Sequence, residues 1–431
     1  MAGTDLIAIL GFVALFGMMA LRVPIGVAMG LVGVFGFASV RGINPALNLL
    51  ASSPIRVITD FNLTLVSFFI LMGIFATNSG ISRELFRAGN AWLGPFKGGL
   101  GLSTIAACGG FAAICGSSVA TAATMSKIAL PEMRRFGYRD DAATGVIAAG
   151  GTLGILIPPS VVMVVYAYIT ETDVGKLFIA GIVPGILAIT MYMAALLIGH
   201  RKSLPAGTPF DLREALRASA GVWAVVVLFV MVIGSIYWGV ATPTEASAIG
   251  ALLTMMVGIM RGRLNFRQIV DSLTEALRTS VSVYTVLIGA ILFGYFLAIT
   301  QSPQKLTSWL VALDYGPMGT LVLILLVFII AGCVLDSMAM IILMVPIVYP
   351  VIVHLGFDPI WFGIIIVMTA ELGLITPPVG INVYVINMIA KDVKLQVIFR
   401  GVMPFIVADV FRLILLVVFP AIVLWLPMTM Q

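Results

Sequence analysis

Ten apolar runs, each long enough to cross a lipid bilayer as a helix, dominate this sequence. They lie near residues 6–21, 24–40, 58–79, 140–170, 174–199, 221–240, 243–260, 281–301, 359–390 and 402–426. Hydrophobic residues make up 61% of the 431 residues and charged residues only 10%, a composition too apolar for a soluble core. Backbone polar groups inside a bilayer need internal partners, so runs of this kind form helices. The sequence therefore predicts an all-α polytopic membrane protein.

Two further apolar segments, 98–132 and 317–355, have a different pattern. Each is long enough for two short helices and is interrupted in its middle by small or polar residues, CGSS at 115–118 and VLDS at 334–337. A segment that enters and leaves a membrane on one side is tolerated only where its tip is buried in protein or lines a wet cavity. We therefore predict two re-entrant helical hairpins.

The runs at 140–170 and 359–390 carry similar interruptions. The first contains GTLGILIPPS at 151–160, and the second contains ELGLITPPVG at 371–380. Glycine weakens a helix, and proline removes a backbone donor and collides with the preceding turn. We therefore predict that both spans are broken helices.

The two halves of the chain repeat one plan. The spacing that separates Pro158 from Pro377, which we call the repeat offset, also relates four further pairs: Pro24 and Pro243, Ser118 and Ser337, Pro131 and Pro350, Gly154 and Gly373. We predict a first repeat over 1–200 and a second over 220–431, joined by a polar connector at 201–219. The connector should contain a short amphipathic helix that starts at Asp211. Segments 82–94 and 303–315 occupy equivalent places and predict an interfacial helix beside each hairpin.

The positive-inside rule gives the two repeats opposite orientations. When the spans alternate from a periplasmic N-terminus, the cytoplasmic side collects 18 of the 24 Lys and Arg residues. The net charge of +5 thus reflects membrane orientation and does not indicate a nucleic-acid partner. Inverted repeats are typical of secondary transporters, whose substrate and ion sites lie at the repeat interface.

Backbone breaks at membrane depth predict two cation sites. In the first half, the tip Gly116 to Ser118 should face a break running from Gly150 through Pro158. In the second half, Asp336 and Ser337 should face Gly373 to Pro378, where Thr376 adds a hydroxyl. Carbonyl oxygens released by a helix break are ligands for a hard cation such as sodium. A carboxylate at the centre of a spanning helix costs roughly 2.5–3.5 kcal/mol, so Asp336 needs a partner, and a cation is the natural one.

The hairpin tips also suit an anionic substrate. Ser117, Ser118, Asp336 and Ser337 lie where a descending half-helix should begin, and helix N-termini attract anions. The serines also fit a purely structural role as helix caps. Lys127 lies in a hairpin arm, where it fits a pair with Glu132, Asp336 or a substrate carboxylate, or an extended side chain that reaches the membrane surface. The chain contains no GxxxxGK[ST], HExxH or GxSxG motif, so we expect neither nucleotide-driven transport nor enzyme activity.

Four motifs resemble the large membrane subunit of tripartite ATP-independent periplasmic (TRAP) transporters: GSSVATAATMSKIALPEM (116–133), GTLGILIPPS (151–160), ATPTEASAIGA (241–251) and GLITPPVGINVYVI (373–386). The resemblance implies an elevator-type, sodium-coupled importer of organic acids, such as C4-dicarboxylates or sialic acid, in a bacterial inner membrane. It also implies two partners, a small four-helix membrane subunit and a periplasmic substrate-binding protein. Because no such membrane segment precedes Met1, we expect the small subunit to be a separate chain.

The resemblance also assigns the sodium ligands. It points to Ser117, Ser118, Gly154 and Pro158 for one site, and to Asp336, Ser337, Gly373 and Thr376, beside Pro378, for the other. The main alternative is a stand-alone sodium/carboxylate symporter that needs no binding protein. An intramembrane enzyme is less favoured, because no motif supplies a second catalytic group facing Asp336. A channel is disfavoured because paired hairpins and broken helices suit a closed, alternating site.

Overall fold

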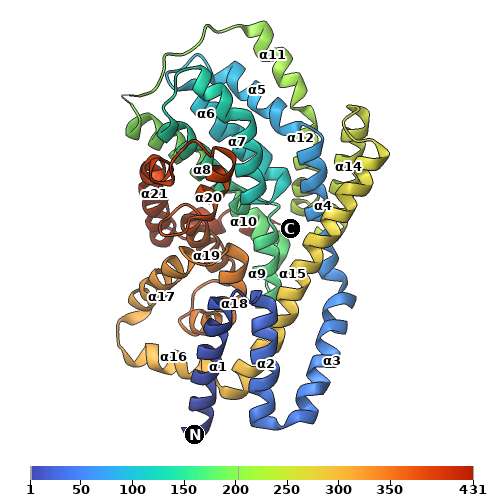
Figure 1. The fold of residues 1–431 in the computed structure, drawn as a ribbon, viewed down its shortest axis with the longest axis vertical. Coiled ribbons are helices and arrows are strands. Elements are labelled where there is room, and N and C mark those ends of the chain that lie inside the picture. Colours follow the sequence, from blue (N-terminus) through green and yellow to red (C-terminus); the bar gives the residue numbers. More distant parts are fainter. Residues whose placement is uncertain (1, 202, 431) are drawn as a thin grey trace.

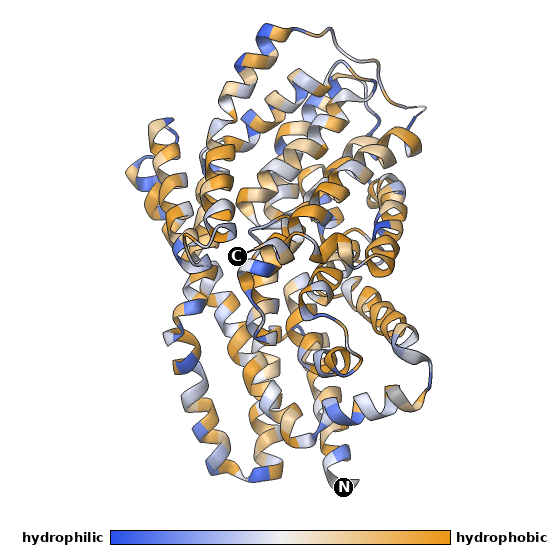
Figure 2. Ribbon diagram, turned by 180° about the vertical axis from the view of Figure 1, so that it is seen from behind, coloured by the Kyte–Doolittle hydropathy of each residue, from blue (hydrophilic) through white to orange (hydrophobic). Residues whose placement is uncertain are grey.

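The computed structural model describes residues 2–201 and 203–430, and this part of the chain forms helices and no β-strand (Figure 1). Seven of its helices are long and apolar enough to cross a membrane. They number eight if Leu212–Gly221 and Trp223–Tyr237, which meet at 45°, count as one span. Apolar residues cover most of the helices, and hydrophilic residues gather at several helix ends and loops (Figure 2). The predicted all-α polytopic fold is confirmed.

The first half of the chain contains ten α-helices. These are α1 (Ala2–Ala20), α2 (Ile25–Arg41), α3 (Ile43–Thr59), α4 (Thr64–Asn78), α5 (Ile81–Leu93), α6 (Gly99–Cys115), α7 (Ser118–Arg135), α8 (Asp140–Leu156), α9 (Val161–Thr170) and α10 (Val174–Gly199). A short 3-10 turn, η1 (Phe61–Leu63), separates α3 from α4. The hairpin is α6 with α7, and the broken helix is α8 with α9.

The second half has the same order of elements. These are α11 (Leu212–Gly221), α12 (Trp223–Phe229), a π-helical turn η2 (Val230–Gly234), α13 (Ser235–Tyr237), α14 (Pro243–Met260), α15 (Phe266–Thr300), α16 (Ser302–Ala312), α17 (Gly316–Gly332), α18 (Ser337–His354), α19 (Pro359–Gly373), α20 (Ile381–Ile389), α21 (Leu395–Val418), α22 (Ala421–Leu424) and η3 (Pro427–Thr429). Here the hairpin is α17 with α18, and the broken helix is α19 with α20.

The repeat is visible in the helix starts. Helices α7 and α18 begin at Ser118 and Ser337, and α8 and α19 begin at Asp140 and Pro359, so both pairs of starts are related by the repeat offset. Helices α5 to α7 lie at one end of the molecule, and α16 to α18 lie toward the other (Figure 1). Each half thus contains one hairpin and one broken helix, as predicted. The residue limits proposed for the repeats remain a prediction.

Two helices differ from the sequence prediction. Residues 43–59 form α3, which lies between two predicted runs and was not predicted as a helix. Pro45 falls in the first turn, where no helical N–H is lost, and α3 accommodates Pro54 in its interior. Helix α15 begins at Phe266, well before the predicted run at 281–301. Its first half is polar on one side, and a capping box between Asn265 and Gln268 starts it there.

The last span also shifts. Helix α21 begins at Leu395 and ends at Val418, whereas the predicted run covered 402–426. Pro420 follows the end of the helix and cannot continue it. The predicted connector helix does begin after Asp211, whose carboxylate accepts hydrogen bonds from the Arg213 and Glu214 amides. Helix α11 packs against α5, where the Trp92 indole donates to the Ser219 hydroxyl at 2.8 Å.

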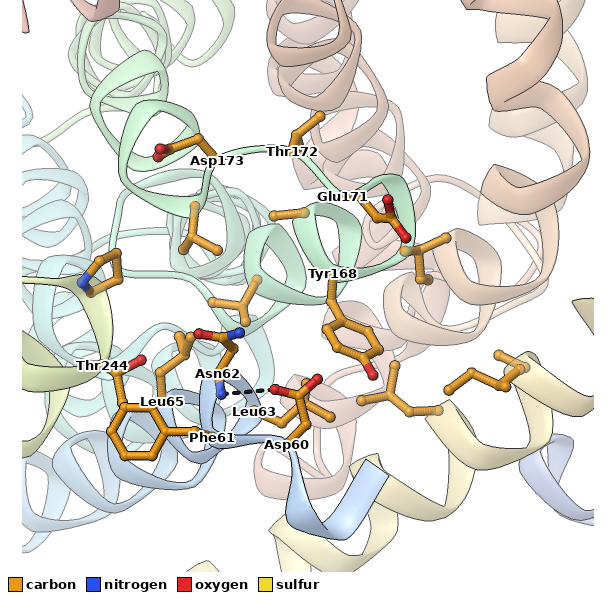
Figure 3. A pocket seen from close by; sticks show the side chains of 18 of the residues that line it. Asp60, Phe61, Asn62, Leu63, Leu65, Tyr168, Glu171, Thr172, Asp173 and Thr244 are labelled. Atoms are coloured by element: carbon orange, nitrogen blue, oxygen red, sulfur yellow. Dashed lines mark hydrogen bonds between the residues drawn. The ribbon is translucent and has the colours of Figure 1, made fainter. Parts of the chain in front are cut away.

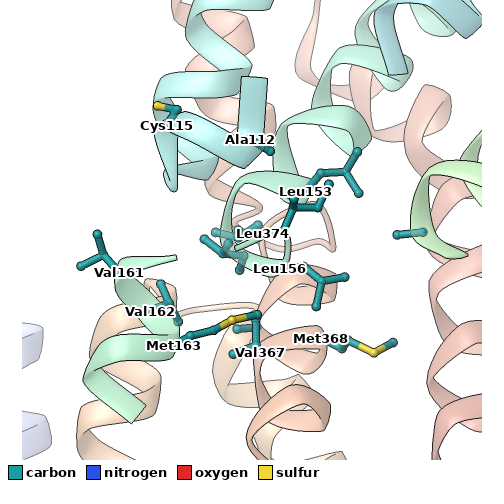
Figure 4. Close-up of a cluster of buried hydrophobic side chains, with 14 of the residues drawn as sticks. Ala112, Cys115, Leu153, Leu156, Val161, Val162, Met163, Val367, Met368 and Leu374 are labelled. Atoms are coloured by element: carbon teal, nitrogen blue, oxygen red, sulfur yellow. The ribbon is translucent and has the colours of Figure 1, made fainter. Parts of the chain in front are cut away.

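Helix α8 is the centre of the structure. It packs against α6 and α7 of its own half and against α21 of the other. Every residue from Ala142 to Leu156 is buried. Around the end of α8, side chains of α9, α19 and the α6 tip form an apolar cluster that includes Leu156, Met163 and Val367 (Figure 4). The two broken helices therefore meet inside a buried, closely packed region.

Candidate functional site

The two hairpin tips meet at one cavity. Its volume is about 510 Å³, and it is lined by Gly116, Ser117 and Ser118 of the first tip and by Asp336 and Ser337 of the second. We call it the tip cavity. Helices α4 and α15 line its other side, through residues that include Asn78, Glu275 and Thr279. Both hairpin tips therefore line one cavity.

The first tip is a tight turn between two helices. Helix α6 ends at Cys115, and Gly116 follows in the left-handed conformation, with φ of 61°. This conformation favours glycine and is common just past a helix end. Ser117 then caps α7, its hydroxyl accepting from the Ala120 amide at 3.3 Å. The tip packs closely against the first break, because a Cβ on Gly116 would lie 2.6 Å from the Pro159 carbonyl oxygen.

The second tip presents a carboxylate. Asp336 caps α18, its carboxylate accepting from the Met338 amide at 3.2 Å, and the residue is exposed to the tip cavity. Ser337, the first residue of α18, is buried. The N-termini of α7 and α18 therefore both begin at the tip cavity, where their unpaired N–H groups favour an anion.

The first break lies later in the chain than predicted. Helix α8 continues through Gly150, Gly151 and Gly154 and ends only at Leu156. The prolines end it, because neither Pro158 nor Pro159 has an N–H to donate to the carbonyl four residues earlier. The carbonyls of Gly154 and Ile155 therefore lack their helical partners. Carbonyls are released as predicted, but the prolines rather than the glycines release them.

The glycines have a different role, which is close packing against the tips. A Cβ on Gly154 would lie 2.5 Å from the Ser117 carbonyl oxygen. A Cβ on Gly373, the last residue of α19, would lie 2.5 Å from the Gly332 carbonyl oxygen, at the equivalent place in the other half. Both glycines therefore let a broken helix touch the backbone of its own hairpin.

The second break repeats this arrangement. Pro377 has no N–H for the Gly373 carbonyl, whose nearest donor is the Thr376 amide at 3.4 Å. The Thr376 hydroxyl donates to the Leu372 carbonyl at 2.7 Å, which leaves its oxygen able to accept or to coordinate. The Val379 amide, beside Pro378, donates to the Cys333 carbonyl of the tip at 3.3 Å. Each break therefore contacts the hairpin tip of its own half.

Lys127 lies on α7 with its side chain exposed, and it lines the tip cavity. Among the described residues it forms no ion pair within 4.0 Å, so the suggested pairs with Glu132 and Asp336 are absent from this conformation. The charged residues around the cavity are therefore Lys127, Asp336 and Glu275. The ammonium group of Lys127 is therefore available to bind a ligand.

A buried charge cluster behind the breaks was not predicted. Arg412 of α21 donates to Glu371 of α19 at 2.6 Å and to Asp409 at 2.7 Å. Arg412 and Glu371 are 0% exposed, and Asp409 is 2% exposed. The sequence did contain a signal, because all three charges lie inside runs that were assigned as apolar spans. Charges at membrane depth mark functional or bracing positions.

Two hydroxyls complete this cluster. Tyr192 of α10 donates to Asp409 at 2.8 Å, and its ring lies under the Arg412 guanidinium, 5.4 Å from ring centre to Cζ. Thr152 of α8 donates to Glu371 at 2.7 Å. The repeat offset also relates Thr152 to Glu371, so they occupy equivalent positions in the two halves. The cluster therefore joins the two broken helices just before Gly154 and Gly373.

Asn382 makes a second link between the halves. It lies on α20, is fully buried, and donates to the Ser118 hydroxyl at 2.7 Å and to the Ala148 carbonyl at 3.2 Å. The second broken helix is thus bonded to the first hairpin tip. Asn382 lies within the motif at 373–386, and no role was predicted for it.

Paired hairpins, paired broken helices and a cavity between the two tips define the class: this is a multi-pass membrane protein with the inverted-repeat architecture of secondary transporters. The family model described as "Tripartite ATP-independent periplasmic transporter, DctM component" matches residues 12–422. The chain belongs to this family, the large membrane subunits of TRAP transporters.

Individual relatives agree. The chain is 38% identical to the C4-dicarboxylate TRAP transporter large permease protein DctM of Pseudomonas aeruginosa, over 90% of this chain and 93% of the relative. It is 31% identical to the sialic acid TRAP transporter large permease protein SiaM of Vibrio cholerae, over 88% and 90%. The YdaH transporter of Alcanivorax borkumensis has a similar fold, with a TM-score of 0.62 at 15% identity over 89% of each chain.

Proposed function

We propose that this chain imports a carboxylate substrate and couples its movement to sodium ions bound at the two tip–break contacts. The observation that carries the proposal is the pairing of each hairpin tip with proline-released carbonyls. The proposed ligands of the first site are Ser117, Ser118, Gly154 and Pro158, and Ser117 and Ser118 lie against Gly154. Those of the second are Asp336, Ser337, Gly373, Thr376 and Pro378, where Gly332 and Cys333, just before the tip carboxylate, make the contacts to the break. Carbonyl, hydroxyl and carboxylate oxygens are the ligands that a hard cation prefers.

The substrate would bind in the tip cavity. Its carboxylate would accept hydrogen bonds from the N-termini of α7 and α18 near Ser118 and Ser337, and Lys127 would add a positive charge. Sodium at the neighbouring sites would offset the charge of Asp336 and raise the affinity for an anion. The relatives act on C4-dicarboxylates and sialic acid, and a carboxylate is the chemical group that these two substrates share.

The tip cavity would open toward the cytoplasm. In the predicted topology Asn78, at the end of α4, lies on the cytoplasmic side, and it lines this cavity. Transport by an elevator motion would move the hairpins and broken helices together past α4 and α15. The closely packed charge cluster supports movement of these elements as one rigid body.

The family supplies the proposed partners and location. We place the chain in a bacterial inner membrane, beside a small four-helix membrane subunit, with a periplasmic protein that delivers the substrate. The membrane potential adds about 2.3 kcal/mol per 100 mV for each net charge moved inward, so co-transported sodium can drive accumulation without a nucleotide.

Reconstitution tests this proposal. Proteoliposomes that contain the chain and both partners should take up a labelled carboxylate only with an inward sodium gradient and the binding protein outside. Succinate and sialic acid are suitable probes. Uptake that persists when potassium replaces sodium would contradict the coupling. Uptake without the binding protein would favour a stand-alone symporter.

A further inference from the structure

A second cavity lies away from the hairpin tips. Its volume is about 740 Å³, and it is bounded by the α3–α4 break, the end of α9 and the middle of α15 (Figure 3). Arg56 lines it, and we call it the Arg56 cavity. Tyr168 of α9 points toward Asp60 at the α3–α4 break (Figure 3). Thr172 and Thr242, which also line this cavity, lie on the periplasmic side in the predicted topology.

The repeat relates the two cavities. The repeat offset carries Arg56, Asp60 and Lys127 onto Glu275, Thr279 and Pro346, respectively. Arg56, Asp60 and Pro346 line the Arg56 cavity, whereas Glu275, Thr279 and Lys127 line the tip cavity. The Arg56 cavity is therefore the counterpart of the tip cavity in the other repeat. Unlike the tip cavity, it is lined by no described residue of either hairpin tip.

Arg56 and Glu275, which occupy equivalent positions in the two repeats, carry opposite charges. Arg56 is exposed, is the one Lys or Arg among the described residues that line its cavity, and takes part in no ion pair within the described chain. A guanidinium matches a carboxylate in a two-pronged contact. Glu275, also exposed, faces the tip cavity instead.

The acidic residues that line the Arg56 cavity form no ion pair with Arg56 in the described part of the chain. The Asp60 carboxylate accepts from the Asn62 amide at 2.9 Å, and the Asp173 carboxylate accepts from the Lys176 amide at 2.8 Å. Glu171 also lines the cavity and adds negative charge, which suits the approach of sodium. Arg56 is therefore the one cationic side chain among the described residues that line this cavity, beside three carboxylates.

We propose that Arg56 binds the substrate carboxylate when the hairpin tips face the Arg56 cavity, and that Glu275 weakens carboxylate binding when the tips face the tip cavity. The inference rests on the proposed function, because it assumes a carboxylate substrate and an alternating site. The proposal therefore predicts tighter substrate binding at the Arg56 cavity than at the tip cavity, which favours transport in one direction. At one pair of equivalent positions, the substrate meets Arg56 on the side of capture and Glu275 on the side of release, whereas Lys127 and Asp336 belong to the hairpins and would move with it.

Cross-linking tests whether the tips reach the Arg56 cavity. In a background lacking Cys108, Cys115 and Cys333, the pair Val119→Cys with Glu275→Cys should react with a bifunctional maleimide, because both positions line the tip cavity. The counterpart pair, related to the first by the repeat offset, is Met338→Cys with Arg56→Cys. It should cross-link in a second, smaller population. No cross-link for this pair, with or without sodium, would overturn the proposal.

Uptake kinetics test the charges themselves. Arg56→Gln should raise the external concentration for half-maximal uptake by about tenfold or more, the usual effect of losing a charged hydrogen bond, and Arg56→Lys should recover part of it. Arg41→Gln is the matched control, since Arg41 is exposed and does not line the cavity. Glu275→Gln should leave this concentration unchanged and slow net uptake relative to exchange. The control Asp271→Asn should leave both the concentration and the ratio of net uptake to exchange unchanged.

The two proposals fail separately. If the wild type takes up neither succinate nor sialic acid with sodium, the proposed function fails. If the wild type transports and Arg56→Gln has the same half-maximal concentration as Arg41→Gln, only this inference is wrong. Thermal melting of each purified variant shows whether a loss of uptake reflects unfolding, and the cross-linking result then decides.

Discussion

Replacing Arg412 with methionine should destabilise the protein strongly. The guanidinium holds two carboxylates, Glu371 at 2.6 Å and Asp409 at 2.7 Å, in a region where all three residues are 0–2% exposed. Removing one member of a buried ion cluster typically costs about 3–5 kcal/mol, because the remaining charges are left buried and uncompensated. Native proteins have a total stability of only about 5–15 kcal/mol. Arg412→Met should therefore accumulate poorly or melt at a much lower temperature.

The comparison that isolates the charge uses three variants. Thermal melting in detergent at fixed sodium should rank wild type above Arg412→Met, with Arg135→Met, an exposed arginine, close to wild type. The triple variant Arg412→Met, Glu371→Gln, Asp409→Asn should regain most of the loss, because buried ion clusters replaced by neutral groups are often no less stable. An Arg412→Met protein that melts together with Arg135→Met would refute the reasoning.

Three further predictions follow from the site. Gly154→Ala and Gly373→Ala should each lower thermal stability and reduce the stabilisation by sodium, because the added Cβ would lie 2.5 Å from the carbonyl oxygen of Ser117 or Gly332. The control is Gly17→Ala, since Gly17 has open space around it, and melting temperatures equal to that of the control would contradict this prediction. Asp336→Asn should raise the sodium concentration for half-maximal uptake while the protein still folds, and an unchanged sodium dependence would remove Asp336 from the site. Cysteines at Ser203 and Gln304, in the cysteine-free background, should be labelled from opposite sides of the membrane, and labelling of both from one side would disprove the inverted topology.

The elements that the sequence predicted best are those set by local backbone chemistry. Gly116 past a helix end and Pro158 without an N–H dictate a turn and a break wherever the chain places them. The apolar pattern then predicts spans. It failed at α3 and at the first half of α15, where polar residues on one side interrupt the run and neighbouring helices stabilise the segment instead.

The charge cluster escaped prediction for a different reason. Glu371, Asp409 and Arg412 come from two helices, and their partners Thr152 and Tyr192 come from two more. No spacing in the sequence brings Tyr192 beside Asp409, because that contact depends on how α10 packs on α21. Sequence reasoning can flag a charge inside an apolar run as needing a partner. It cannot name the partner without the packing.

The repeat conserves backbone determinants and varies the charges, and this division has a physical basis. Gly154 and Gly373, and Pro158 and Pro377, are repeated because each half breaks its helix at the same place and packs it closely against its own hairpin, Gly154 on Ser117 and Gly373 on Gly332. Thr152 faces Glu371, while Lys127 and Arg56 correspond to Pro346 and Glu275. A symmetric set of charges would bind an anion equally well from either side. On the proposed mechanism, unequal charges on an equal backbone would give the two conformations different affinities, which is the thermodynamic requirement for a ligand to shift a two-state equilibrium.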